Sequence, residues 1–229
     1  MDIDHLLDRN RFQPNAAILR RSELGDLRFD PRISHGEDWD LWLRLAERGM
    51  RWAVVREEVA AYRVRPSGAS HSFGAMALSM RSVLENAFER CRTQRAAVVP
   101  ATGLRAERMH ASIRRLALHQ ATAASLLDRT PDAREALTIL ASNWTTPGVD
   151  ATAAELADGA FWMVPFAEGR APSAWYDADD ATLSRYMLAL EVLWARCVRE
   201  GFISGSAVGA ARERLAALCV RPEMIADRL

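Results

Sequence analysis

Two adjacent carboxylates at the start of an expected helix are the residues of this sequence best placed to do chemistry. Glu37 and Asp38 follow Gly36 and open a short amphipathic run that stops at Gly49. A carboxylate at a helix start faces free backbone N–H groups and the positive end of the helix dipole, which favour its ionised form. A proton acceptor must be ionised. The sequence therefore makes Asp38 a candidate general base.

The residues that follow predict a rigid support for these carboxylates. Apolar side chains recur at helical spacing and form one face, at Trp39, Trp42, Leu43 and Ala46. Trp39 has two interpretations, because an aromatic ring can form the wall of a ligand pocket or belong to the core. Asp40 and Arg44 are spaced i,i+4, which predicts a solvated surface ion pair.

The combined pattern resembles the acceptor-side Glu-Asp motif of family 2 glycosyltransferases, which have the GT-A fold. Upstream, Asn15–Ser22 and Leu27–Pro31 are similar to the family's strand, its Arg-Arg-Ser turn and its Gly-Phe-Asp run. Downstream, Arg51–Arg56 and Val59–Arg65 predict two strands, followed by a turn that contains serines. The resemblance covers about residues 10 to 72, under a third of the chain.

The resemblance implies an inverting transfer of a sugar from a nucleotide-sugar donor to a hydroxyl of a glycan or other acceptor. Asp38 would take the proton from that hydroxyl; the alternative is that it only caps the helix. Glu37 would orient Asp38 or contact the acceptor, or would only complement the helix dipole. Arg63 and Arg65 would bind the donor diphosphate, or are surface arginines.

One half of the family pattern is not found in the sequence. In the family, an N-terminal half with an Asp-x-Asp motif holds the nucleotide-sugar and a divalent metal, Mg²⁺ or Mn²⁺. Residues 1–10 do not match that half, and Arg65 replaces a histidine that can contact the metal or diphosphate. We therefore expect this chain to bind no cofactor and to be inactive alone. We expect His35 to be a loop residue and Asp177–Asp180 to be a helix-start cluster, not metal ligands.

Composition narrows the functions that remain. The 229 residues carry a formal net charge of zero, and all 30 basic residues are arginine. No basic field therefore points to nucleic acid or to an anionic membrane. Cys91, Cys197 and Cys219 form no Cys-x-x-Cys pair and fit reduced thiols in a cytoplasmic protein. We recognise no signal peptide and no apolar run long enough to cross a bilayer.

The periodicity of the apolar residues predicts two domains. Residues 1–71 predict a partial GT-A domain with α/β structure, and residues 72–229 predict a larger all-α domain. Its helices are expected at 72–95, 104–127, 132–142 (with a start at Thr130–Pro131), 151–163, 181–200 and 206–219. Residues 116–127 and 133–140 predict an αα-hairpin with alanines at the crossing. This tail supports an alternative function, a non-catalytic module that binds a protein partner.

Overall fold

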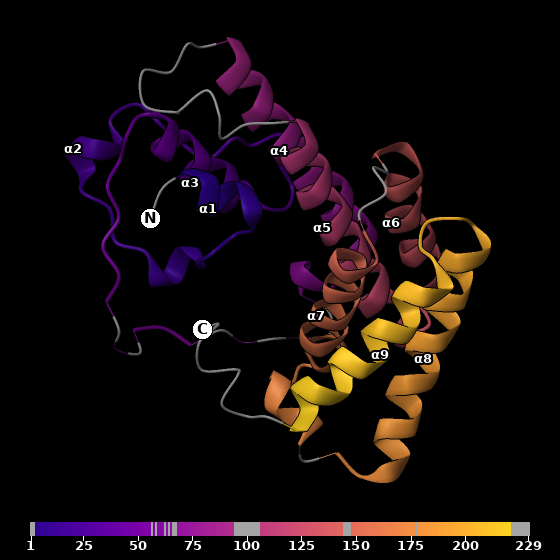
Figure 1. Cartoon of the computed structure of the whole chain (residues 1–229). Coiled ribbons are helices and arrows are strands. Elements are labelled where there is room, and N and C mark those ends of the chain that lie inside the picture. The colour runs from indigo at the N-terminus through magenta and orange to yellow at the C-terminus, as the bar shows by residue number, and fades with distance from the viewer. Residues whose placement is uncertain are drawn as a thin grey trace. The chain divides into compact units, whose positions relative to one another are not determined.

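The computed structural model of the chain is helical and has no β-strand among the residues it describes (Figure 1). Those residues are 3–55, 57, 59–61, 63, 65, 68–93, 106–143, 148–176 and 178–220. The α-helices are α1 (Ile3–Asp8), α2 (Arg21–Leu24), α3 (Glu37–Glu47), α4 (Phe73–Thr93), α5 (Ala106–Leu126), α6 (Thr130–Asn143), α7 (Val149–Ala167), α8 (Asp180–Arg199) and α9 (Gly205–Val220). Short 3-10 helices are η1 (Pro14–Ala16), η2 (Ala69–His71) and η3 (Pro172–Trp175).

The predicted α/β fold of the N-terminal region is wrong. Residues 51–55 are irregular. The upstream stretch, residues 15–22, was expected to form a strand and an Arg-Arg-Ser turn, but it begins within η1, is irregular at residues 17–20 and ends within α2. A strand forms only where a neighbouring strand accepts its backbone hydrogen bonds and covers one face. The described residues provide no such neighbour, and Val54, Val55 and Val59 stay 73%, 63% and 62% exposed. The strand predictions at residues 56, 58, 62 and 64 lie outside the described residues.

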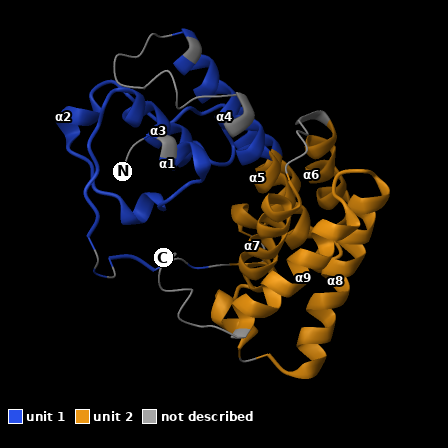
Figure 2. Ribbon diagram, in the orientation of Figure 1, with its two compact units in different colours: residues 1–63, 78–113 blue, residues 64–77, 114–229 orange. Residues whose placement is uncertain are grey.

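The chain forms two compact units, each made of two separate stretches (Figure 2). The first unit contains residues 1–63 and 78–113, and the second contains residues 64–77 and 114–229. The division passes within α4 and α5, so the two ends of each of these helices belong to different units. Helical periodicity alone does not reveal this arrangement, because it locates helices without saying which of them pack together.

In the first unit, α1 packs against α3. The sequence suggested only a short lead at residues 1–10, but Leu6 and Leu7 of α1 are 0% and 2% exposed. The indole Nε1 of Trp39 donates a hydrogen bond of 2.6 Å to the carbonyl of Leu6. A helix of six residues is not stable alone in water, so this packing on α3 is what holds α1.

Glycines fix both ends of α3. Gly36 precedes the helix with φ of 76°, and a Cβ there would lie 3.3 Å from Met80, so the position favours glycine twice over. Beyond the other end, Gly49 has φ of 79°. The N–H groups of Gly49 and Met50 donate to carbonyls of the last turn at 2.9 and 3.1 Å, the Schellman arrangement. The predicted helix and its glycine stop are confirmed.

The predicted helices of the C-terminal region are confirmed in the described residues. Each end of α4 to α9 lies within four residues of its expected position. In the second unit, α7 packs on α9 and on η3. The αα-hairpin is present, because Ala124 of α5 and Ala133 of α6 belong to one core cluster. Between the two helices, Asp128 takes φ of 53° and lets Arg129 donate its N–H to the carbonyl of Ala124 at 2.9 Å.

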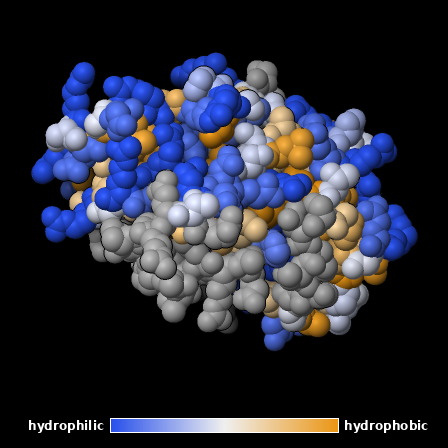
Figure 3. Space-filling view, turned by 90° about the horizontal axis from the view of Figure 1, so that it is seen from above, coloured by the Kyte–Doolittle hydropathy of each residue, from blue (hydrophilic) through white to orange (hydrophobic). Residues whose placement is uncertain are grey.

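The three cysteines are free thiols, as predicted. Burial raises the pKa of Cys91 and of Cys219 to about 11 and that of Cys197 to about 12, which keeps them protonated at neutral pH. Among the residues coloured by hydropathy in Figure 3, most are hydrophilic, and the apolar ones lie in separate patches. Within the described ranges, no helix has both the length and the apolar character needed to cross a membrane.

Candidate functional site

The carboxylate of Asp38 is buried and held on both oxygens. Asp38 is the second residue of α3, and only 6% of it is exposed. Its Oδ2 accepts a hydrogen bond of 3.0 Å from Nδ2 of Asn10, and its Oδ1 accepts one of 2.7 Å from the backbone N–H of Trp39. Two separate segments of the chain therefore fix the orientation of this carboxylate.

Burial raises the pKa of Asp38 above its ordinary value. The hydrogen bonds from Asn10 and Trp39 lower it by less, and the charge of Glu37 raises it further. The sequence predicted the opposite tendency, because a helix start favours an ionised carboxylate. Burial destabilises the ionised carboxylate by more than the two hydrogen bonds stabilise it. A carboxylate with a raised pKa is a stronger proton acceptor.

Glu37 is the first residue of α3 and is partly exposed. Within the described residues, no hydrogen bond or ion pair engages its carboxylate. Its shown effect is electrostatic, because it raises the pKa of the adjacent Asp38. The roles predicted for Glu37 toward an acceptor or toward the helix dipole stay predictions.

Trp39 lies in the core. Only 2% of it is exposed, and its indole N–H is occupied by the carbonyl of Leu6. Of the two interpretations that the sequence allowed, this position matches the core residue and leaves no ring face for a sugar. The other members of the predicted apolar face, Trp42, Leu43 and Ala46, are also buried.

Arg63 and Arg65, the predicted diphosphate ligands, are exposed and lie outside any helix. Arg63 belongs to the same unit as Asp38, whereas Arg65 belongs to the second unit. Neither side chain forms a hydrogen bond or ion pair with another described residue. The structure therefore does not bring Arg63 and Asp38 into contact, and a role in phosphate binding stays a prediction.

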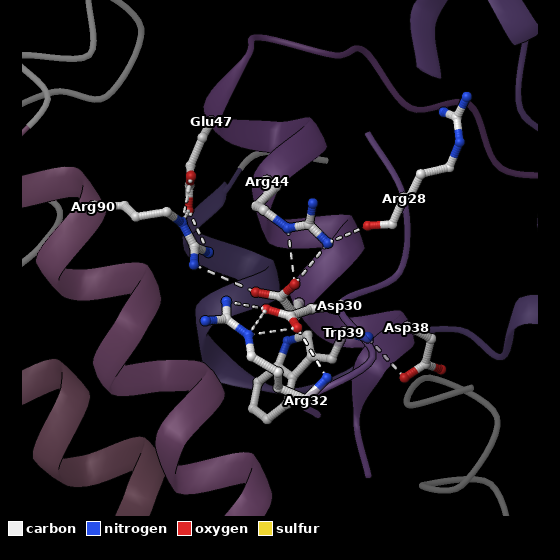
Figure 4. A network of polar contacts seen from close by, with 9 residues as sticks. Arg28, Asp30, Arg32, Asp38, Trp39, Arg44, Glu47 and Arg90 are labelled. Carbon is white, nitrogen blue, oxygen red and sulfur yellow. Dashed lines mark hydrogen bonds and ion pairs between the residues drawn. The ribbon is translucent and has the colours of Figure 1, made fainter. Parts of the chain in front are cut away.

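A buried ion network lies on α3 next to the candidate base (Figure 4). Oδ2 of Asp40 accepts from Arg44 at 2.8 Å, and its Oδ1 accepts from Arg90 of α4 at 3.4 Å. Arg90 also donates to both oxygens of Glu47, at 2.9 and 3.0 Å. The predicted pair of Asp40 and Arg44 is confirmed, but its solvated setting is wrong, since Asp40 is 3% exposed.

This network engages Asp40 and Glu47 of α3 and does not include Asp38. Figure 4 shows the carboxylate of Asp38 pointing away from Arg90 and Glu47. Arginines neutralise Asp40 and Glu47, which suits them to holding α3 against α4 within the first unit. Sequence spacing could not reveal Arg90, because it lies 50 positions from Asp40.

An aromatic cluster that the sequence did not single out lies one turn along α3 from Asp38. Trp42 follows Asp38 by four residues, so the two are neighbours on one helix face. The ring of Phe12 lies 5.1 Å from that of Trp42 and 5.0 Å from that of Trp52. The indole N–H of Trp52 is buried and makes no hydrogen bond. The partly exposed rings of Phe12 and Trp52 are the aromatic surface that this cluster presents beside α3.

No set of three or more His, Cys, Asp or Glu side chains able to hold a metal ion occurs in the part of the chain that the structure describes. Asp179 instead caps α8 and accepts the N–H of Thr182 at 2.9 Å, as predicted for a helix start. Asp177 lies outside the described residues. His35 lies in the loop before α3, where its ring contacts Ser34 at 3.0 Å.

No protein-family model matches the sequence, and no curated protein and no solved structure matches the chain. The residues and the geometry of the site therefore carry the functional argument.

Proposed function

We propose that this chain supplies the acceptor side of an inverting glycosyl transfer, with Asp38 as the general base. The resemblance of residues 10–72 to family 2 glycosyltransferases suggests the reaction. The setting of Asp38 is the observation that carries the proposal: a buried carboxylate with a raised pKa, oriented on both oxygens. Because residues 51–55 are irregular, the proposal concerns the base and its helix and not a complete transferase fold.

In this reaction, Asp38 takes the proton of the acceptor hydroxyl while the hydroxyl oxygen attacks the anomeric carbon of the donor sugar. The bond from that carbon to the diphosphate oxygen breaks, and the configuration at the carbon inverts. A positioned general base contributes about 10²–10⁴-fold to such a step. A divalent metal, Mg²⁺ or Mn²⁺ in intact members of the family, would neutralise the leaving diphosphate. No residue of this chain is assigned to that task.

The aromatic cluster suggests where the acceptor binds. Trp42 lies one helical turn from the candidate base and is buried, whereas Phe12 and Trp52, whose rings contact it or its neighbour, are partly exposed, and sugars pack their apolar faces on exposed aromatic rings. We therefore propose a carbohydrate acceptor for this site.

The test is a transfer assay with protein that also carries a nucleotide-sugar-binding half. Asp38→Asn should abolish transfer and leave nucleotide binding unchanged, because an amide cannot accept the proton. Asp26→Asn is the matched control, since Asp26 is an exposed carboxylate of the same unit that forms an ion pair with Arg48. An Asp38→Asn variant with near wild-type turnover would rule out the assigned role.

A further inference from the structure

Helix α8 in the second unit presents apolar residues to solvent. Leu188 and Val192 are 66% and 62% exposed, although both belong to a helix whose opposite face is buried. Ala195 and Arg199, both exposed, continue the same line along the helix. The spacing 188, 192, 195, 199 is the alternation of four and three residues found at the seam between two packed helices. This stripe is therefore shaped to receive another helix.

A shallow groove of about 380 Å³ between α8 and α9 runs beside the stripe. Its apolar lining comes from Ala195, Val198, Gly205 and Val208. Its charged lining residues differ in their partners. Glu191 and Arg212 pair with each other, with Nε of Arg212 at 2.6 Å from the carboxylate, and so neutralise each other. Arg199 makes no hydrogen bond or ion pair with any described residue. The groove therefore combines an apolar floor with the positive charge of Arg199, which no described residue neutralises.

We propose that the stripe and groove bind an amphipathic helix of a partner protein that carries a carboxylate next to its apolar residues. Apolar side chains at i, i+4 and i+7 of such a helix would pack on Leu188, Val192 and Ala195. These three positions and Arg199 span about 16 Å along α8, which is three turns of a partner helix. The guanidinium of Arg199 would receive the carboxylate through two parallel hydrogen bonds.

Charge argues against a second copy of this chain as the occupant. If two α8 helices pack antiparallel with Val192 at their crossing, Arg199 of one copy lies opposite Arg185 of the other. Arg185 already pairs with Glu168, so this register offers no free carboxylate to Arg199. If the register shifts to bring Asp180 to Arg199, Glu191 is placed against Leu188, and burial of this carboxylate is unfavourable. Parallel packing places Arg199 of one copy against Arg199 of the other, which like charge disfavours. An acidic partner meets neither penalty.

The probe for this surface is a pair of synthetic helical peptides with leucine at i, i+4 and i+7. One peptide carries glutamate beside the leucines, and its twin carries lysine at the same position. Fluorescence anisotropy with the full chain should show that the glutamate peptide binds about tenfold more tightly than its twin. Val192→Glu should abolish this binding. Arg199→Glu should reverse the preference, and Arg214→Glu, an exposed charge reversal on α9 outside the groove lining, should leave it unchanged.

Three results would overturn the proposal. The first is failure of the glutamate peptide to bind, and the second is equal binding of both peptides. The third comes from sedimentation of the wild-type chain: a dimer that Val192→Glu dissociates would identify a second copy as the occupant. Circular dichroism of each variant confirms its helical fold, so that loss of binding reports the surface and not unfolding.

Discussion

The side chain of Asn10 donates a hydrogen bond of 3.0 Å to Oδ2 of Asp38 across 28 positions of sequence. This bond ties the segment after α1 to the first turn of α3. Two residues further along the same segment, the carbonyl of Phe12 accepts a hydrogen bond from the indole of Trp42. Residues 10–12 therefore run along α3 and fix both the candidate base and the aromatic cluster beside it.

Removal of the Asn10 donor should raise the pKa of Asp38 further. The Asn10 hydrogen bond stabilises the ionised carboxylate and so lowers the pKa. In Asn10→Ala this contribution is lost, and the rise in pKa caused by burial is larger. Titration of the Asp38 carboxyl by ¹³C NMR measures the change. Asn15→Ala is the control, because Asn15 donates only to the carbonyl of Ala61 at an exposed site. An unchanged or lower pKa in Asn10→Ala would contradict this explanation of the Asp38 environment.

The pH dependence of stability should reveal the raised pKa of Asp38. Because its pKa is higher in the folded than in the unfolded state, Asp38 favours folding at low pH, and this contribution is lost as pH rises through the folded-state pKa. The free energy of unfolding of wild type minus that of Asp38→Asn should therefore fall with rising pH. Urea unfolding at a series of pH values measures it.

Asp26 should show the opposite dependence of stability on pH. Its hydrogen bond with Arg48 lowers its pKa, so its contribution to stability is lost as pH falls through the folded-state pKa. The difference between wild type and Asp26→Asn should then rise with pH. Parallel slopes for the two variants would show that Asp38 is not desolvated in the folded protein.

The helices of this protein could be predicted from sequence because their signals are local. The apolar face of α3 and its stop at Gly49 are visible within 14 residues, and the structure confirms both. The start of α6 at Thr130 followed by Pro131 is equally local. Periods of 3.6 residues and terminal signals of this kind require no knowledge of distant partners.

The features that could not be predicted depend on residues far apart in the chain. Val54 and Val55 have the side chains of a strand, but a strand also needs a paired neighbour, and the described residues offer none. The pKa of Asp38 follows its burial, which a helix start does not specify. The i,i+4 spacing of Asp40 and Arg44 predicted an exposed ion pair. It could not show that Asp40 is buried, because the burial involves Arg90, which lies 50 positions away in the sequence.

Loss of Arg90 should destabilise the first unit. Arg90→Ala would remove the guanidinium that donates to the buried carboxylate of Glu47 at 2.9 Å and would remove one donor from Asp40. Removal of one partner from a buried ion pair costs about 3 kcal/mol. Urea unfolding monitored by circular dichroism measures this loss. Arg48→Ala removes an exposed ion pair in the same unit and should have a much smaller effect. Equal effects would show that the buried network does not hold α3.

Two glycines in the second unit should respond oppositely to alanine. A Cβ on Gly159 of α7 would lie 2.8 Å from the ring of His119, so Gly159→Ala overpacks this contact at a cost of about 1–3 kcal/mol. A Cβ on Gly209 of α9 would meet nothing within 4 Å. Gly209→Ala should therefore stabilise the protein by about 0.5–1 kcal/mol through helix propensity. Thermal unfolding of both variants measures the two changes in stability. A stabilising effect of Gly159→Ala would show that α7 can shift away from His119.

The 229 residues alone should bind no nucleotide-sugar and hydrolyse none, with or without Mn²⁺. A displacement at an anomeric carbon requires neutralisation of the departing diphosphate by a metal or by clustered cations. Under the proposed function the residues that resemble the glycosyltransferase family would supply only the acceptor side. Their candidate cations, Arg63 and Arg65, are exposed and form no hydrogen bond or ion pair with another described residue. Calorimetric titration with a uridine diphosphate sugar should therefore show no heat of binding. Micromolar affinity would mean that this chain builds a donor site from residues outside the family pattern, and Arg63→Ala with Arg65→Ala would then show whether these two arginines form it.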